Sequence, residues 1–173
     1  MRQSTAVISA ALLLGAVTAH AQSAAAVKID PTWLRADTAT KTAEFKLVGG
    51  LTSLNGGMNF DGFDKGGLTI TVPLGWNVVI RFKNEDQNLP HSVEIIPDTT
   101  ALPLGPVPPA FDRATTGRLE QGFTAGQGSE IRFVAGKGGS FLIFCAVPGH
   151  GAAGMWIRLR VVAGADKPSL ATS

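Results

Sequence analysis

Cys145, His150 and Met155 stand five positions apart in a segment rich in glycine and alanine. A thiolate, an imidazole and a thioether on a loop of small residues form a soft donor set that can hold a metal ion. A second imidazole is needed to close such a site, and His91 supplies one from a distant part of the chain. Two imidazoles and a thiolate in a trigonal arrangement, with a methionine at long axial distance, are the ligands of copper sites that transfer electrons. The spacing therefore predicts a one-electron carrier with one copper ion.

The small number of metal-binding side chains strengthens this prediction. The chain has one Cys, three His and three Met, and Met1 and His20 lie in an N-terminal segment that has the features of a removable signal. A single Cys in an exported protein has no partner for an internal disulfide, so it is buried, paired between chains or bound to a metal. Apart from Met58, which we expect in the core, the remaining candidates all belong to the predicted site.

Other metals and reactions fit these residues less well. Zinc would favour further Cys, His or carboxylate ligands over a thioether, and a cysteine protease needs an orienting Asn or Asp in a motif that the sequence lacks. Two alternative functions remain: a copper carrier or chaperone without redox cycling, which favours an open site, and a small copper redox enzyme, which needs an open coordination position or a second metal. Visible absorption that a one-electron reductant bleaches reversibly would separate an electron carrier from both.

Residues 1–21 have the composition of a targeting segment. Met1-Arg2, an apolar stretch and the small-residue site Ala19-His20-Ala21 are typical of a secretory signal peptide. An uncleaved membrane anchor is the alternative, because the uncharged stretch approaches the length that spans a bilayer. We expect a periplasmic or otherwise extracytoplasmic protein, with any membrane association through this segment. The net charge of +2 gives no reason to expect a nucleic-acid partner.

The elements that must position these residues are predicted to be short β-strands. The composition, with 21 Gly and 10 Pro, favours many short elements joined by turns. Asp30 and Pro31 predict a short helix at 29–34. Apolar periodicity predicts strands at 42–48, 68–73, 76–84, 92–96, 130–134, 140–145 and 155–162. Alternation within 76–84 indicates a half-buried antiparallel sheet, and the whole pattern favours an all-β sandwich or barrel.

The chain has the length of one domain. After the signal, we expect a lead-in at 22–40, a domain at 41–164 and a flexible tail at 165–173. A connection rich in Pro and Gly runs through 97–121. A connection of this length inside a compact domain indicates an excursion that has a functional or shielding role, or is partly mobile.

The sequence resembles a known family in three places. The segment 144–156, FCAVPGHGAAGMW, the segment 89–92, LPHS, and the strand pair around 72–78 are similar to the cupredoxins, and most closely to the sulfocyanins. The resemblance covers roughly 55–162. It implies a Greek-key β-sandwich and one type 1 copper in a respiratory or related electron-transport chain. It also implies that the family's ligand positions are His91, Cys145, His150 and Met155.

The residue after the first His ligand departs from the family pattern. Many cupredoxins have Asn there, where it braces the two ligand loops, and this chain has Ser92. The shorter hydroxyl can form fewer such bonds, which affects loop rigidity and reduction potential rather than ligation. We also expect the backbone N–H groups of Ser92 and Val147 to donate to the Cys145 sulfur.

The outer surface of the loop around His150 predicts where a partner binds. Residues 147–153 apart from His150 are small or apolar, so a redox protein could approach the edge of the His150 ring. Small interfaces that dissociate quickly suit electron-transfer pairs. We therefore expect redox proteins as partners of this surface.

Overall fold

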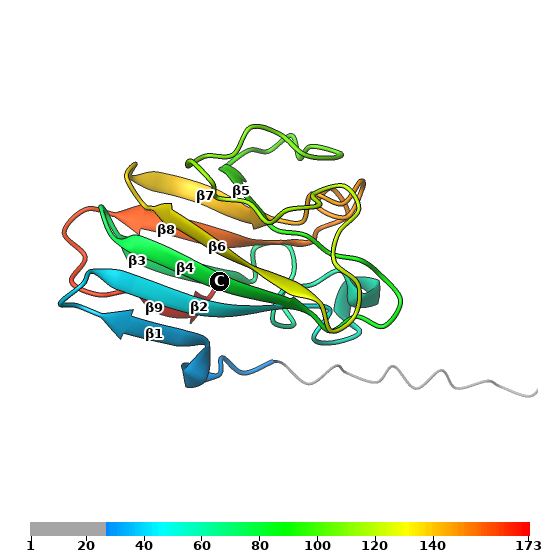
Figure 1. The fold of residues 1–173 in the computed structure, drawn as a ribbon, viewed down its shortest axis with the longest axis horizontal. Coiled ribbons are helices and arrows are strands. Elements are labelled where there is room, and N and C mark those ends of the chain that lie inside the picture. The colour runs from blue at the N-terminus through cyan, green and yellow to red at the C-terminus, as the bar shows by residue number, and fades with distance from the viewer. Residues whose placement is uncertain (1–26) are drawn as a thin grey trace, which may run out of the picture.

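The computed structural model describes residues 27–173, so the predicted signal segment 1–21 lies outside the described residues. Two β-sheets pack face to face (Figure 1). One has the strand order β1-β2-β4-β6 and the other β5-β7-β8-β3-β9. The described residues contain no α-helix, only the 3-10 turns η1 (Pro31–Trp33) and η2 (Leu54–Gly57). The predicted all-β sandwich is confirmed. Nowhere in 27–173 is a helix both long and apolar enough to cross a membrane.

The strand bounds follow the apolar alternation closely. The first sheet consists of β1 (Leu34–Asp37), β2 (Thr42–Gly49), β4 (Asn77–Asn84) and β6 (Gly128–Val134). The second consists of β3 (Leu68–Pro73), β5 (Glu94–Pro97), β7 (Gly139–Phe144), β8 (Trp156–Val162) and β9 (Ser169–Thr172). The short helix predicted near residue 30 is η1, where the Asp30 side chain accepts a hydrogen bond from the backbone N–H of Thr32.

Strand β4 shows how the sequence sets the two faces of a sheet. Val78, Ile80 and Phe82 are buried in the core between the sheets, whereas Arg81 and Lys83 are exposed on the outer face. Burying such apolar side chains contributes about 1.5–3 kcal/mol each, which is the main driving force for closing the sandwich. The outer ion pairs contribute much less, because solvent screens them.

The prediction that residues 76–84 lie in an antiparallel sheet is wrong for one of the two neighbouring strands. Strand β4 pairs antiparallel with β6 but parallel with β2. In the other sheet, β3 likewise pairs parallel with β8 and antiparallel with β9. Alternation determines which side chains face the core, but it carries no information on the direction of the neighbouring strand. Successive strands β3 and β4 lie in different sheets, so their neighbours come from distant parts of the sequence.

Both ends of the described chain are more ordered than predicted. The expected lead-in at 22–40 contributes β1, which pairs with β2. The tail at 165–173 was expected to be flexible, but Ser169–Thr172 form β9 along the edge of β3. Leu170 packs against the core from this strand. A four-residue strand with one apolar anchor is too short to produce a clear periodic signal.

The connection between β5 and β6 packs on the sandwich. Phe111 is 8% exposed and packs on the rings of Phe133 and Phe141, with centroids 5.1 and 4.7 Å away. The buried carboxylate of Glu94 accepts the N–H of Val107 at 3.2 Å. The predicted excursion is therefore present, and its contacts hold it against residues of both sheets.

The loops that carry the candidate site gather at one end of the sandwich. In Figure 1, residues 50–67 (teal) and the loop 145–155 (orange) lie at the same end. The side-chain amide of Asn55 donates to the carbonyl of Ala153 at 3.1 Å, which joins the two loops directly.

Candidate metal centre

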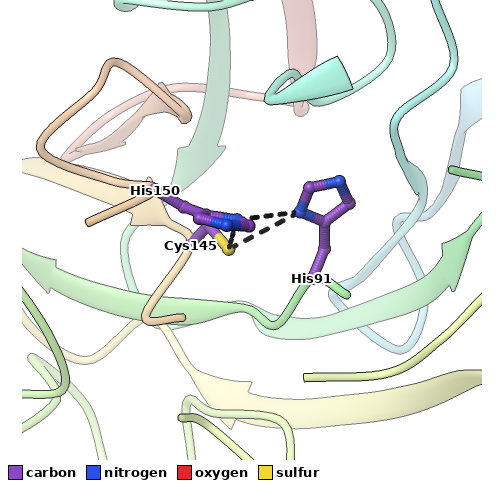
Figure 2. A group of neighbouring side chains, drawn as sticks. All are labelled: His91, Cys145 and His150. Carbon is purple, nitrogen blue, oxygen red and sulfur yellow. Dashed lines mark hydrogen bonds between the residues drawn. The ribbon is translucent and has the colours of Figure 1, made fainter. Parts of the chain in front are cut away.

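Three of the four predicted ligands meet at this end (Figure 2). Nδ1 of His91 lies 4.0 Å from Sγ of Cys145, and Nδ1 of His150 lies 3.8 Å from the same sulfur. The two Nδ1 atoms are 3.2 Å apart. Figure 2 shows the two imidazole rings and the thiol directed toward one another, with His91 on one segment and Cys145 and His150 on another.

The three donor atoms fit a single metal ion. A point equidistant from them would lie about 2 Å from each, close to the lengths of metal–nitrogen and metal–sulfur bonds. Two imidazole nitrogens and one thiolate in a trigonal arrangement are the donor set of type 1 copper. The arrangement therefore fits one type 1 copper ion, which His91, Cys145 and His150 would hold.

His91 is fixed by backbone pairing just before β5. Its N–H donates to the carbonyl of Phe123 at 3.1 Å, and its carbonyl accepts from the N–H of Phe123 at 2.8 Å. The side-chain amide of Asn84 donates to the carbonyls of Leu89 and Phe123. The ring is fully buried. Asn84 thus ties the end of β4 to the segment that delivers the first imidazole.

Cys145 and Met155 extend the β7–β8 ladder by one residue. The N–H of Cys145 donates to the carbonyl of Met155 at 3.1 Å, and the N–H of Met155 donates to the carbonyl of His150 at 3.0 Å. The side chains of Cys145 and Met155 are both fully buried in one core cluster. The backbone of Met155 is therefore bonded to both loop ligands. The axial role of its thioether remains a prediction.

The loop between them is a series of tight turns. The N–H of His150 donates to the carbonyl of Val147, and the N–H of Gly154 donates to that of Gly151. Gly149 and Gly154 have φ values of 84° and 109°, which glycine adopts without strain. His150 is partly exposed. Its ring is thus the ligand nearest to solvent, whereas His91 and Cys145 are shielded.

The sulfur of Cys145 accepts a hydrogen bond from the backbone. The N–H of Ser92 donates to Sγ at 3.5 Å. The N–H groups of Ser92 and Val147 both act to lower the pKa of the thiol. The predicted Ser92 donor is confirmed, and the Val147 donor stays a prediction. The Ser92 hydroxyl donates to the carbonyl of Leu119 at 2.7 Å. The serine at this position therefore also ties the first ligand segment to the long connection.

The pKa shifts of the donors are set mainly by burial. Burial raises the pKa of Cys145 to about 11, against the opposing effect of the Ser92 and Val147 N–H groups. Burial also lowers the pKa values of His91 and His150. At neutral pH the metal-free site thus holds a protonated thiol and two neutral imidazoles. Metal binding must displace the thiol proton, because the thiolate is the ligand form.

Asp86 is a neighbour of the site that the sequence analysis did not identify. Its Oδ2 lies 3.3 Å from Nε2 of His91. Burial raises the pKa of Asp86, but hydrogen bonds from the N–H groups of Asn88 and Leu89 and from His91 outweigh it, so the pKa lies below its usual value. In the sequence, Asp86 is an acid in a polar loop, and the only available signal was its proximity to His91.

The chain is similar to known proteins in both sequence and fold. The sulfocyanin (SoxE) domain family matches residues 31–170. Sulfocyanin from Sulfolobus acidocaldarius is 30% identical over 105 residues, which cover 57% of this chain and 52% of that protein. The chain thus spans about half the length of this curated relative.

Two solved structures share the fold. A histidine-to-methionine variant of rusticyanin has a TM-score of 0.53 and 22% identity, covering 70% of this chain and 78% of the other. Reduced auracyanin from Roseiflexus castenholzii has a TM-score of 0.50 and 23% identity, covering 74% and 99%. Both support the cupredoxin-like β-sandwich.

Proposed function

Because the chain belongs to the sulfocyanin family, we propose that it carries single electrons between redox partners of an exported or membrane-linked electron-transport chain. The bound copper ion would supply the Cu(I)/Cu(II) couple. The observation that carries the proposal is the convergence of Cys145 Sγ with the Nδ1 atoms of His91 and His150 on one point.

The protein contributes rigidity and exclusion of water. His91, Cys145 and Met155 are fully buried, and the backbone bonds of the β7–β8 ladder hold two of them. A scaffold that keeps the donors in place favours neither oxidation state strongly through geometry, so little rearrangement accompanies electron transfer. This supports an electron carrier over a protein that must open to release its metal.

The direct test is to add Cu(II) to the purified metal-free protein and record visible and EPR spectra. We expect an intense visible band that one electron equivalent per protein bleaches reversibly. Cys145→Ser should abolish the band, because the thiolate ligand is lost, while the far-UV circular dichroism stays that of the wild type. A folded wild-type protein that binds Cu(II) without the band would contradict the proposal.

Two further assays separate the alternatives. A copper chaperone would pass its ion readily to a competing thiol chelator, whereas a carrier should retain it through many redox cycles. A small copper redox enzyme would turn over an oxygen or nitrogen oxide substrate, and its site would bind an exogenous anion such as azide with a change in the EPR spectrum. We expect neither rapid transfer nor anion binding.

We further propose that redox proteins dock on the apolar loop surface around His150. Pro148, Gly149 and Ala153 are exposed there. Leu104, 74% exposed, joins them, because its carbonyl accepts the N–H of Gly149 at 2.8 Å. The long connection thus adds one large apolar side chain beside the loop. A small apolar contact next to a partly exposed ligand suits brief encounters.

Electron self-exchange tests this surface without a known partner. Ala152→Glu should slow exchange between reduced and oxidised copies, measured by NMR line broadening, because two carboxylates would face each other at the contact. The visible spectrum should stay nearly unchanged. Val134→Glu is the control for added charge. Val134 is an exposed residue at the end of β6, where it pairs with Asn77 of β4. Equal slowing by both variants would exclude docking at the loop.

Export is proposed from residues 1–21 alone. Mass spectrometry of the protein recovered from soluble and membrane fractions distinguishes the two outcomes. A soluble form that begins near residue 22 supports a cleaved signal, and an intact membrane-bound form supports an anchor. An intact form in the cytoplasm would contradict both.

A further inference from the structure

We propose that Asp86 is a positioning residue of the copper site, which selects the metal-binding tautomer of His91 and stabilises the oxidised state by its charge. This inference rests on the proposed function of the site. It assigns a role to a carboxylate that contacts His91 and is not among the three converging donors.

The geometry places Asp86 directly behind the first imidazole. Its Oδ2 lies 3.3 Å from Nε2 of His91, the nitrogen that faces away from the other donors. Its Oδ1 accepts hydrogen bonds from the N–H groups of Asn88 and Leu89 at 2.8 and 3.1 Å. One oxygen is thus held by the backbone, which leaves the other directed at the ring.

The glycine loop at 50–57 closes over this carboxylate. A Cβ at Gly57 would overlap Oδ2 of Asp86, and a Cβ at Gly50 would overlap the Asp86 Cβ. Both glycines have positive φ values, 93° and 68°. The Asp86 side chain is 8% exposed, and Asp86 is one of the residues that line a surface cleft of about 300 Å³. Close packing on both sides fixes the carboxylate with respect to His91.

A fixed acceptor at Nε2 determines which nitrogen is free to bind. Neutral imidazole carries one N–H, and the other nitrogen offers its lone pair. With the proton on Nε2 and donated to Asp86, the Nδ1 lone pair faces Cys145 Sγ and His150 Nδ1. The other tautomer would direct an N–H into the site and oppose metal binding. A carboxylate behind a metal-binding histidine fixes the tautomer and raises the basicity of the ligand nitrogen.

The negative charge of the Asp86 carboxylate changes the relative stability of the oxidised and reduced states of the site. A negative charge close to a ligand attracts the oxidised site, which carries one more positive charge than the reduced site. His91 and Asp86 are both buried, so the attraction is screened less than at the surface. Asp86 therefore lowers the reduction potential compared with a neutral residue at this place.

Asp86→Asn tests both effects. The amide oxygen can keep the bonds from Asn88 and Leu89, but its NH₂ group then faces Nε2 and favours the Nδ1–H tautomer of His91. In the metal-free variant we expect the ¹⁵N NMR signals of the His91 ring to change from the Nε2–H to the Nδ1–H pattern. We expect copper affinity to fall at least tenfold. The oxidised-to-reduced ratio at a fixed solution potential should also fall at least tenfold.

Glu85→Gln is the matched control, because it removes the same charge one residue away. Its side chain is 41% exposed and pairs with Lys83 rather than with His91. It should leave the tautomer unchanged and shift the redox ratio much less than Asp86→Asn does. Equal shifts in the two variants, or an unchanged tautomer in Asp86→Asn, would overturn the inference.

The wild-type protein provides a measurement that does not depend on the variant folding. In the metal-free wild type, His91 must carry its proton on Nε2, and an Nδ1–H signal would overturn the positioning role. Failure of the wild type to form a coloured copper site would instead contradict the proposed function. The two failures are therefore distinguishable.

Discussion

At the scale of single residues, Met155 is the predicted ligand whose role is still a prediction. Its backbone lies at the site, but the binding of its thioether to copper is untested. Its side chain is fully buried and its backbone bonds to both Cys145 and His150. Met155→Leu keeps volume and apolar character but removes the sulfur. Since the axial sulfur stabilises Cu(II) more than a methyl group can, we expect a coloured protein whose reduction potential rises by about 59 mV or more, a tenfold change for one electron.

Met58→Leu is the control for this prediction. Met58 packs against the same core cluster, partly buried, and was expected to have no ligand role. Protein-film voltammetry on both variants should show the shift in Met155→Leu alone. A potential that is the same in Met155→Leu as in the wild type would remove Met155 from the ligand set.

The site residues differ in how readily they could be predicted from the sequence. Cys145, His150 and Met155 could be predicted together because rare side chains recur at a fixed interval. His91 followed because few other His were available. Asp86 could not be predicted, because one acid in a polar loop resembles any solvated acid. Its role depends on a contact that forms only when β4, the glycine loop and the first ligand segment come together.

At the scale of elements, the ligand loop 145–155 packs on β7 through one close contact. Gly151 is buried against the ring of Phe144, and a Cβ at this position would overlap that ring. Phe144 is fully buried and cannot move aside easily. Gly151→Ala should therefore destabilise the protein by about 1–3 kcal/mol, as overpacking does, and displace His150.

Chemical denaturation and the visible spectrum measure the two effects. Gly117→Ala is the control, because Gly117 is exposed and an added Cβ there meets no neighbour within 4 Å. A Gly151→Ala protein with wild-type stability and colour would show that the loop adapts, and that Phe144 does not fix its position.

The strands were predictable one by one, but their partners were not. In β2, β3, β4 and β8, alternating burial reproduces the apolar pattern of the sequence. The parallel pairing of β2 with β4 follows from chain topology, which a local pattern does not contain. Strand β9 was missed because its only partly buried residue is Leu170. Periodicity thus gives the faces of the elements, and the fold determines their neighbours.

At the scale of the whole molecule, the two sheets converge on loops that are held by polar contacts as well as by the core. Asp61 makes two of these contacts, both with Val48. Its N–H donates to the carbonyl of Val48, and its Oδ1 accepts the N–H of Val48, both at 2.8 Å. The residue is 2% exposed and has a positive φ of 52°. A single carboxyl group therefore closes the turn after β2.

Burial of this carboxyl predicts how global stability depends on pH. Burial raises the pKa of Asp61 to about 7, and the Val48 N–H opposes the shift only partly. In the unfolded chain the pKa is about 3.9. Between these values the native state holds a proton that the unfolded state has released, so the free energy of unfolding falls as pH rises from about 4 to about 7. The stabilisation that comes from the protonated Asp61 carboxyl group is complete below pH 4 and is lost above pH 7.

Asp61→Asn isolates this contribution. The amide keeps the acceptor for Val48 and tolerates the positive φ, but it does not titrate. Urea unfolding of the metal-free proteins should give similar stabilities at pH 4.5, and the variant should be more stable at pH 8 by at most about 4 kcal/mol, the limit for a shift of about three pKa units. Asp112→Asn, with a side chain 91% exposed, should follow the wild type throughout. If wild type and Asp61→Asn lose stability in parallel between pH 4 and 7, the Asp61 carboxyl is already ionised in the native state, and the turn after β2 holds a buried charge.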